Sequence, residues 1–133
     1  HFFWDKKKVD TTIHLTPNLT MHKLSDTLFL EYMAGCKAYA TTGGFESVCE
    51  AMYMQKPVLM VPTHIEQECN VMDVLRSGAG VTDEEFDLDI LLDCIPAYKR
   101  TNEFRHWTHT AESLFMYELT RFETEETAAF AAL

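Results

Sequence analysis

Residues 37–62 decide the fold; they read KAYATTGGFESVCEAMYMQKPVLMVP and predict a strand, a helix and a second strand. The second strand lies in PVLMVP, residues 57–62, a continuous apolar run between two prolines. Such a run is typical of a strand that is buried on both faces of a parallel sheet. Two glycines separate the first strand, at 37–42, from a helix that we expect to end near Gln55. The centre of the chain is therefore a βαβ unit.

Strand and helix patterns continue to alternate on both sides of this unit. We expect further strands at 1–4, 11–15 and 79–82, and helices at 26–35, 65–77 and 87–98, with the last stopped at Pro96. This alternation predicts an α/β fold with a doubly wound, Rossmann-like parallel sheet. In such sheets ligands bind beyond the carboxyl ends of the strands. The turns that follow 37–42 and 57–62 therefore form one candidate site.

The last third of the chain differs from the rest. A long amphipathic helix is expected from about residue 101, and its aromatic face includes Phe104, Trp107 and Phe115. This face could cover one side of the sheet or dock a partner domain outside the chain. We assign residues 1–122 to one domain and 123–133 to an acidic, alanine-rich tail.

Composition narrows the function classes. The 133 residues carry a formal net charge of −10, which disfavours nucleic acid as a partner because its recognition needs a basic surface. No apolar run is long enough to span a membrane. The four cysteines show no metal-like spacing, and a cytoplasmic protein with reduced thiols is expected. Because the chain starts at His1, directly on an apolar segment, we expect it to be part of a longer protein.

The first turn contains Gly43 and Gly44, which can turn tightly and let a ligand approach the backbone closely. The helix that follows offers unpaired N–H groups and the positive end of its dipole. Together with the hydroxyl groups of Thr41, Thr42 and Ser47, these donors could bind a phosphate-sized anion. A purely structural tight turn would use the same two glycines.

Glutamates in the following helix allow two interpretations. Ser47 and Glu50 match the S-x-x-E capping box, in which the serine caps the helix and the glutamate bonds back to it. Alternatively, Glu50 could accept hydrogen bonds from the vicinal hydroxyls of a ribose. Glu46 lies one turn earlier on the same face.

The second turn carries Glu66, Gln67 and Asn70, whose polar groups suit the alternating hydroxyls of a sugar. Thr63 and Glu66 repeat the capping-box spacing, so the structural alternative applies here too. A metal cluster around His64 is not favoured, because the spacing matches no zinc or di-iron pattern.

Residues 36–81 resemble the donor-binding, C-terminal half of GT-B glycosyltransferases. The similar families are the undecaprenyl-pyrophosphoryl-muramoyl-pentapeptide N-acetylglucosaminyltransferases and the UDP-glycosyltransferases. The shared order is a strand, a glycine turn with a serine, a glutamate on the helix, a strand ending in proline, and then Gln67 and Asn70 three residues apart.

The resemblance implies that the intact protein transfers a hexosyl group from a nucleotide sugar, with UDP favoured, to an acceptor. The acceptor would bind an N-terminal domain missing from this chain, so the fragment alone would be inactive and would contain no catalytic residue. No cofactor and no metal are expected. The implied contacts are Thr42, Gly43, Gly44 and Ser47 with the diphosphate, Glu50 with the ribose, and Glu66, Gln67 and Asn70 with the sugar or its turn.

Departures from the family pattern are also informative. Thr42 stands where plant-type members have His, and Glu46, where they have Asn, has no role that the pattern explains. The base-binding loop is expected near residues 15–22, without the usual Trp or Gln. The fragment would lack the first strand and helix of its domain.

The aromatic helix around Phe104, Trp107 and Phe115 would pack on the missing acceptor domain. Peripheral membrane contact is compatible with the full protein. Two other functions share the architecture: half of a nucleotide-sugar 2-epimerase, and a non-catalytic nucleotide-sugar-binding or interaction module.

Overall fold

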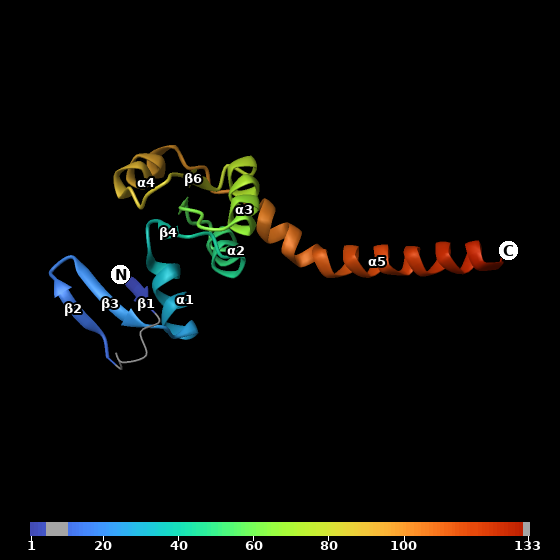
Figure 1. The fold of residues 1–133 in the computed structure, drawn as a ribbon, viewed down its shortest axis with the longest axis horizontal. Helices are drawn as coiled ribbons and strands as arrows, with labels where there is room; N and C mark the ends of the chain where they lie inside the picture. The colour runs from blue at the N-terminus through green and yellow to red at the C-terminus, as the bar shows by residue number, and fades with distance from the viewer. Residues whose placement is uncertain (5–10, 132–133) are drawn as a thin grey trace. The chain divides into compact units, whose positions relative to one another are not determined.

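The structure, a computed structural model, describes the backbone of residues 1–4 and 11–131 and the side chains of these residues up to Phe122. The chain divides into two compact units, His1–Arg100 and Thr101–Leu133 (Figure 1). Each unit is described separately below.

The centre of the first unit is a parallel sheet of three strands. They are β4 (Tyr39–Thr41), β5 (Val58–Met60) and β6 (Gly80–Thr82), in the order β4-β5-β6. All three residues of β5 have no exposed surface, which confirms that PVLMVP contains a strand buried on both faces. A Cβ atom at Gly80 would lie 2.0 Å from the Val58 carbonyl oxygen, so this close approach of β6 to β5 requires glycine.

Helices lie on both faces of this sheet, as β5 shows. Val58 and Met60 belong to a core cluster with residues of α1 (Asp26–Gly35), α2 (Phe45–Tyr53) and α3 (Ile65–Arg76). Leu59 and Val61 instead pack against Leu91 of α4 (Leu88–Cys94), because successive side chains of a strand point to opposite faces. A short 3₁₀ helix, Ile95–Ala97, follows α4 and contains the expected helix-stopping proline. The Rossmann-like α/β architecture is confirmed for this part of the chain.

A second sheet precedes α1 and departs from the prediction. It contains β1 (Phe2–Trp4), β2 (Ile13–Thr16) and β3 (Leu19–Lys23) in the order β1-β3-β2. β1 is parallel to β3, whereas β2 is antiparallel to it. Residues 15–22, expected to form a loop, therefore belong to a β-hairpin. At its turn, the Asn18 N–H donates to Thr16 Oγ1 at 3.2 Å.

Helix α1 links the two sheets. The Phe29 ring lies 5.2 Å from the Phe3 ring of β1 and 5.8 Å from the Tyr39 ring of β4. At the other end of the helix, Lys56 Nζ donates to the carbonyl oxygens of Ala34 at 2.7 Å and Cys36 at 2.9 Å. A cation at a helix C-terminus bonds the last free carbonyls and opposes the negative end of the dipole. These contacts attach α1 to both β1 and the segment before β5.

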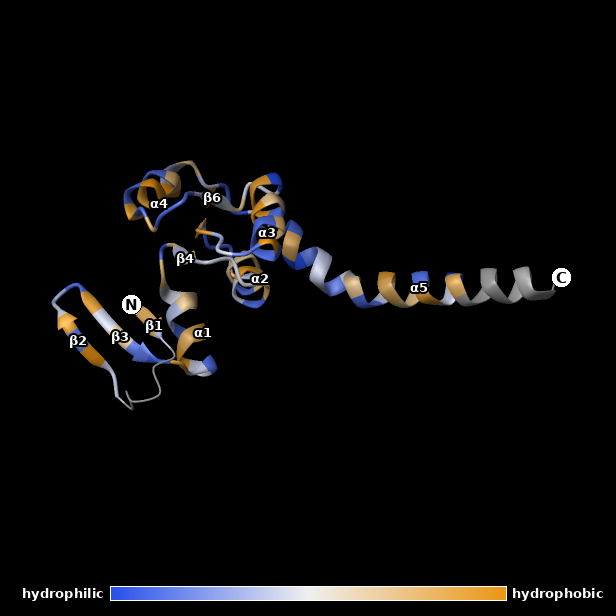
Figure 2. Ribbon diagram, in the orientation of Figure 1, coloured by the Kyte–Doolittle hydropathy of each residue, from blue (hydrophilic) through white to orange (hydrophobic). Residues whose placement is uncertain are grey.

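The second unit is the helix α5 (Glu103–Ala131), which continues through most of the segment assigned to a tail. Apolar and polar residues alternate along it in Figure 2. Several of its large apolar side chains are exposed, including Trp107 at 55% and Phe115 at 66%, whereas Phe104 is half-buried. Throughout the part of the chain that is described, no helix combines the length and apolar character needed to cross a membrane.

Candidate functional site

The first turn, between β4 and α2, is built around Gly43. This residue is buried and has φ of +94°, a conformation that favours glycine. A Cβ atom here would lie 2.7 Å from Met60 Cε and 3.5 Å from Gln67 Cβ. Gly44 has φ of −58°, and a Cβ atom on it would meet nothing within 4 Å. Only Gly43 is therefore required by the backbone, while Gly44 leaves the space beside the turn open.

The N-terminus of α2 has no side-chain cap. Gly44 is the N-cap residue, and the helix begins at Phe45, which makes Ser47 the third helical residue. The Ser47 hydroxyl donates to the Gly44 carbonyl oxygen at 3.3 Å and so does not cap the helix. The capping-box interpretation of Ser47 and Glu50 is therefore wrong. The N–H groups of the first turn keep their bonding capacity for a ligand.

Glu50 and Glu46 lie near each other on α2, and the negative charge around them is dense. Burial raises the pKa of Glu50, and the carboxylates of Glu46 and Asp26 raise it further. Glu50 is half-buried, whereas Glu46 is exposed. The surroundings of Glu50 therefore disfavour its charged form, and hydrogen-bond donors from a ligand would stabilise that form.

The second turn, between β5 and α3, is tied to the first by side-chain amides. Gln67 Oε1 accepts hydrogen bonds from the Thr63 N–H at 2.7 Å and the Thr63 hydroxyl at 3.0 Å. Gln67 Nε2 donates to Thr42 Oγ1 at 3.5 Å. Asn70 Nδ2 donates to the Gly43 carbonyl oxygen at 2.9 Å. In this structure, the side chains of Gln67 and Asn70 thus form hydrogen bonds that join the two turns.

The capping-box interpretation also fails at this second turn. His64 is the N-cap residue of α3 and makes no side-chain cap. Thr63 bonds to Gln67 instead. Glu66 lies in the first turn of α3 and is exposed, so its carboxylate is open to solvent.

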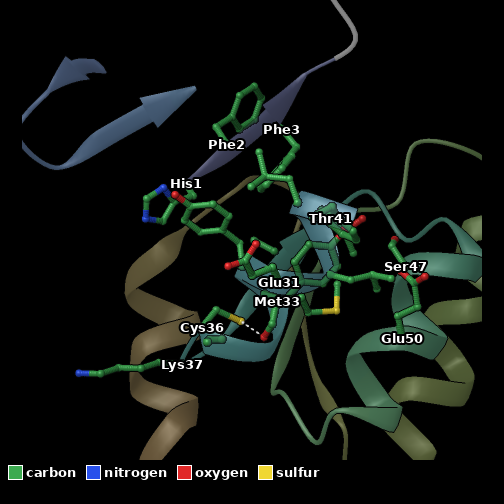
Figure 3. Close-up of a pocket in the computed structure, with 18 of the residues that line it drawn as sticks. His1, Phe2, Phe3, Glu31, Met33, Cys36, Lys37, Thr41, Ser47 and Glu50 are labelled. Atoms are coloured by element: carbon green, nitrogen blue, oxygen red, sulfur yellow. Dashed lines mark hydrogen bonds between the residues drawn. The ribbon is translucent and has the colours of Figure 1, made fainter. Parts of the chain in front are cut away.

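A groove of about 1620 Å³ borders the first turn (Figure 3). Thr41, Thr42, Glu46, Ser47 and Glu50 line it, whereas Glu66, Gln67 and Asn70 lie outside it. The structure therefore divides the predicted residues into two groups. The first lines the groove, and the second, which also includes Gly43 and Gly44, does not.

Sequence reasoning missed Asp26 at the start of α1, which lines the same groove and acts on the pKa of Glu50. No sequence signal indicated it, because α1 reaches the site only through the fold. Among the side chains that the structure describes, in residues 1–4 and 11–122, no group of three from His, Cys, Asp or Glu is placed to hold a metal ion.

Fold and site together define a Rossmann-like α/β domain with its polar residues at the carboxyl ends of parallel strands. The sequence model of glycosyl transferase family 1 matches residues 7–96, more than half of the chain. The protein therefore belongs to glycosyl transferase family 1, and the expected transferase class is confirmed. No curated protein matches the chain.

Proposed function

We propose that the chain is the donor-binding, C-terminal half of a GT-B glycosyltransferase, truncated at its N-terminus. Its relatives would be the undecaprenyl-pyrophosphoryl-muramoyl-pentapeptide N-acetylglucosaminyltransferases and the UDP-glycosyltransferases. The observation that carries this proposal is the uncapped N-terminus of α2, which follows Gly43 and borders a groove lined by Glu50.

The diphosphate of a nucleotide sugar fits the first turn. The backbone N–H groups at the start of α2 point toward a bound anion, and the helix dipole favours its negative charge. Gly44 has no Cβ to block the approach, and the Thr42 hydroxyl can add a donor. The Ser47 hydroxyl adds a second if it gives up its bond to the Gly44 carbonyl oxygen. These local donors must act against a net charge of −10, so binding depends on close contact rather than on long-range attraction.

Glu50 fits the ribose. A pair of vicinal hydroxyls can donate two hydrogen bonds to its two carboxylate oxygens. Hydrogen bonds to the charged form favour ionisation, so ribose binding would lower the pKa that burial and neighbouring carboxylates raise. Glu46 is exposed and turns its charge toward water or toward sugar hydroxyls rather than toward the diphosphate.

The transferred hexosyl group fits beside the start of α3. Glu66 is exposed there and can accept hydrogen bonds from sugar hydroxyls. Asn70 serves the sugar indirectly, because its bond to the Gly43 carbonyl fixes the turn that holds the diphosphate. Gln67 has the same positioning role and keeps part of its amide capacity for the sugar.

In the intact protein, an N-terminal domain would bind the acceptor and supply the catalytic base. The exposed aromatic face of α5, with Trp107 and Phe115, would pack on that domain. No metal would take part, because the N-terminus of α2 would stabilise the negative charge of the leaving diphosphate. UDP is the favoured nucleotide and the cytoplasm the favoured compartment, the latter in keeping with four free cysteines.

Calorimetric titration with UDP-, GDP- and dTDP-sugars tests the donor site. We expect saturable binding of one nucleotide class, and Glu50→Gln should weaken it about tenfold, by roughly the value of a hydrogen bond to a charged group. Glu85→Gln, an exposed carboxylate outside the groove, is the matched control and should bind as the unaltered chain does. Absence of binding to all three classes, or equal affinity of the Glu50 variant, would contradict the proposal.

The incompleteness of the chain has its own test. Radiolabelled sugar transfer should be undetectable with this chain alone, and restoring the N-terminal domain should produce it. The family match already favours transfer over 2-epimerisation. Restored binding without turnover would instead identify a non-catalytic module.

A further inference from the structure

The first sheet contains a buried histidine that the proposed donor site does not use. His22 of β3 is only 3% exposed, whereas the nearby His1 and His14 are exposed. His22 is also absent from the lining of the groove. Histidine is the side chain whose ordinary pKa lies closest to neutral pH, so a buried histidine makes the stability of its surroundings sensitive to pH.

The His22 ring packs against two other elements of the first unit. It stacks on Phe3 of β1, with 4.9 Å between the ring centroids and 23° between the ring planes. The Tyr32 ring of α1 lies 4.6 Å from His22 and 5.9 Å from Phe3. These three rings therefore attach the first sheet to α1.

Both ring nitrogens of His22 lie within hydrogen-bonding distance of a neighbour. Nε2 is 3.0 Å from Nδ1 of His1, and Nδ1 is 3.3 Å from Oγ1 of Thr12. A hydrogen bond between two imidazole nitrogens needs one N–H group and one lone pair. If both rings were charged, each nitrogen would carry a hydrogen, and the contact between His1 and His22 would become repulsive.

The surroundings of His22 disfavour its charged form. Burial lowers the pKa of His22, and the positive charges of the N-terminal ammonium and of His14 lower it further. Tyr32, the titratable side chain that α1 packs against the ring, offers an aromatic face and not a carboxylate. The attached state of the sheet therefore favours a neutral imidazole.

We propose that His22 is a pH-sensitive attachment of the first sheet to α1, which loosens when the ring becomes charged in acid. His1, Phe3 and Tyr32 contact His22 and also line the groove, and Figure 3 shows His1 and Phe3 at its wall. Acid would therefore alter the part of the groove wall that β1 forms. The buried core of the parallel sheet consists of apolar residues, so β4, β5 and β6 would stay in place.

The direction of the pH effect follows from the lowered pKa of His22. A detached ring in water takes up its proton near the ordinary pKa of about 6.5. The stability that the neutral ring contributes is present above that value and is lost as the pH falls below it, toward the pKa of the attached ring. Because His22 lies outside the groove, the effect can be measured whether or not a nucleotide sugar binds.

Amide hydrogen exchange of the 133-residue chain tests the attachment. Protection factors, which correct for the pH dependence of intrinsic exchange, are compared between the amides of β3 and those of β5. Between about pH 7.5 and about pH 5, the β3 factors should fall relative to the β5 factors, by at most about 30-fold. That limit applies to a ring that is uncharged when attached and has an ordinary pKa when detached. Constant β3 protection, or an equal fall in both strands, would overturn the proposal.

His22→Gln isolates the contribution of the ring. The glutamine amide can donate and accept hydrogen bonds but does not titrate in this range, so β3 protection should lose its pH dependence. The matched control is His106→Gln, which replaces an exposed histidine of α5 and should keep the full pH dependence. If the His22 variant also keeps it, the dependence belongs to His1 or His14, and the role of His22 is overturned.

A titration of the unaltered chain decides the question if His22→Gln does not fold. Nuclear magnetic resonance of histidine-labelled protein follows the charge of the His22 ring directly. Its midpoint should lie below the ordinary value of about 6.5, and β3 protection should fall between that value and the midpoint. A His22 midpoint at or above the ordinary value would contradict a neutral ring in the attached state and overturn the proposal.

Discussion

The two turns that follow β4 and β5 have similar sequences but use their polar residues differently. Around Gly43 and Gly44, the backbone donors at the helix start have no side-chain cap. Around Thr63, the side chains of the next helix reach back and bond to both turns. The first turn leaves the backbone donors of its helix uncapped, whereas side chains from the second turn hold the first in place.

This difference predicts that substitutions at the two turns have different effects. Substitutions at the first turn should affect ligand affinity, with the exception of Gly43, whose conformation the fold requires. Changes at Asn70 should affect folding first and binding only through the turn. The following predictions test that division.

Gly43→Ala should have the largest effect. The left-handed conformation strains an alanine, and its Cβ would lie 2.7 Å from Met60 Cε. Backbone strain and overpacking together should lower the free energy of unfolding by about 2–4 kcal/mol. Urea denaturation followed by circular dichroism measures this. A loss below about 0.5 kcal/mol, the range of ordinary surface substitutions, would contradict the assigned conformation.

Asn70→Ala should have the next largest effect. It leaves the buried Gly43 carbonyl without its side-chain donor, and an unsatisfied buried polar group costs about 1–3 kcal/mol. The matched control is Glu66→Ala on the same helix, an exposed residue that should change stability by less than about 0.5 kcal/mol. Equal losses in both variants would show that the bond to Gly43 has no special role.

Gly44→Ser should change stability in the opposite direction. Serine is a better N-cap than glycine, so the free energy of unfolding should rise by a few tenths of a kcal/mol. The same hydroxyl would accept from the N–H groups proposed to bind the diphosphate, so nucleotide-sugar affinity should fall. Urea denaturation measures the gain in stability, and calorimetric titration measures the loss of affinity. Unchanged affinity would argue against anion binding at the N-terminus of α2.

Glu50→Gln should have the smallest effect on stability, and the size of that effect depends on pH. Because the folded-state pKa of Glu50 is raised, ionisation costs the folded state more than the unfolded state. The stability present below the unfolded pKa is lost as pH rises through the folded pKa. The glutamine variant should therefore be more stable than the unaltered chain at pH 7, and the difference should vanish in acid. Thermal unfolding across pH measures it.

Most of the parallel sheet could be predicted from the sequence. PVLMVP is uniformly apolar, and its neighbours follow helical or strand periods that match the observed β4, α2, α3 and β6. Pro96 correctly marked the end of α4, with a short 3₁₀ turn in place of the last helical residues. Local patterns sufficed here because each segment's preference for helix or strand agrees with the burial of its side chains in the fold.

Strand β3 could not be recognised, because its buried face is polar. Thr20 and His22 are its buried residues, while Leu19 is exposed. His22 is buried because its ring stacks on Phe3 at 4.9 Å and packs on Tyr32 at 4.6 Å. Those partners come from distant segments, so hydrophobic patterning within β3 gives no indication of burial.

The sequence predicted that the turns after 37–42 and 57–62 lie next to each other, but it did not predict the hydrogen bonds between them. The S-x-x-E spacing suggested caps at both turns, yet Gly44 and His64 determine where the helices begin. The Asn70 bond joins residues 27 apart in sequence, and only the fold reveals it. The domain boundaries and the ligand roles stay predictions.

Lys56 attaches the C-terminal end of α1 to the segment before β5. One ammonium group bonds two carbonyls at the end of α1, and α1 is the helix that carries the aromatic contacts to β1. Acetylation of that ammonium would remove the charge and leave a single N–H for two carbonyl acceptors. The end of α1 would then be less firmly held, although the contacts of Phe29 and Met33 keep the helix against both sheets. Because Cys36 lines the groove, a modification at Lys56 would alter the part of the groove wall that the end of α1 forms.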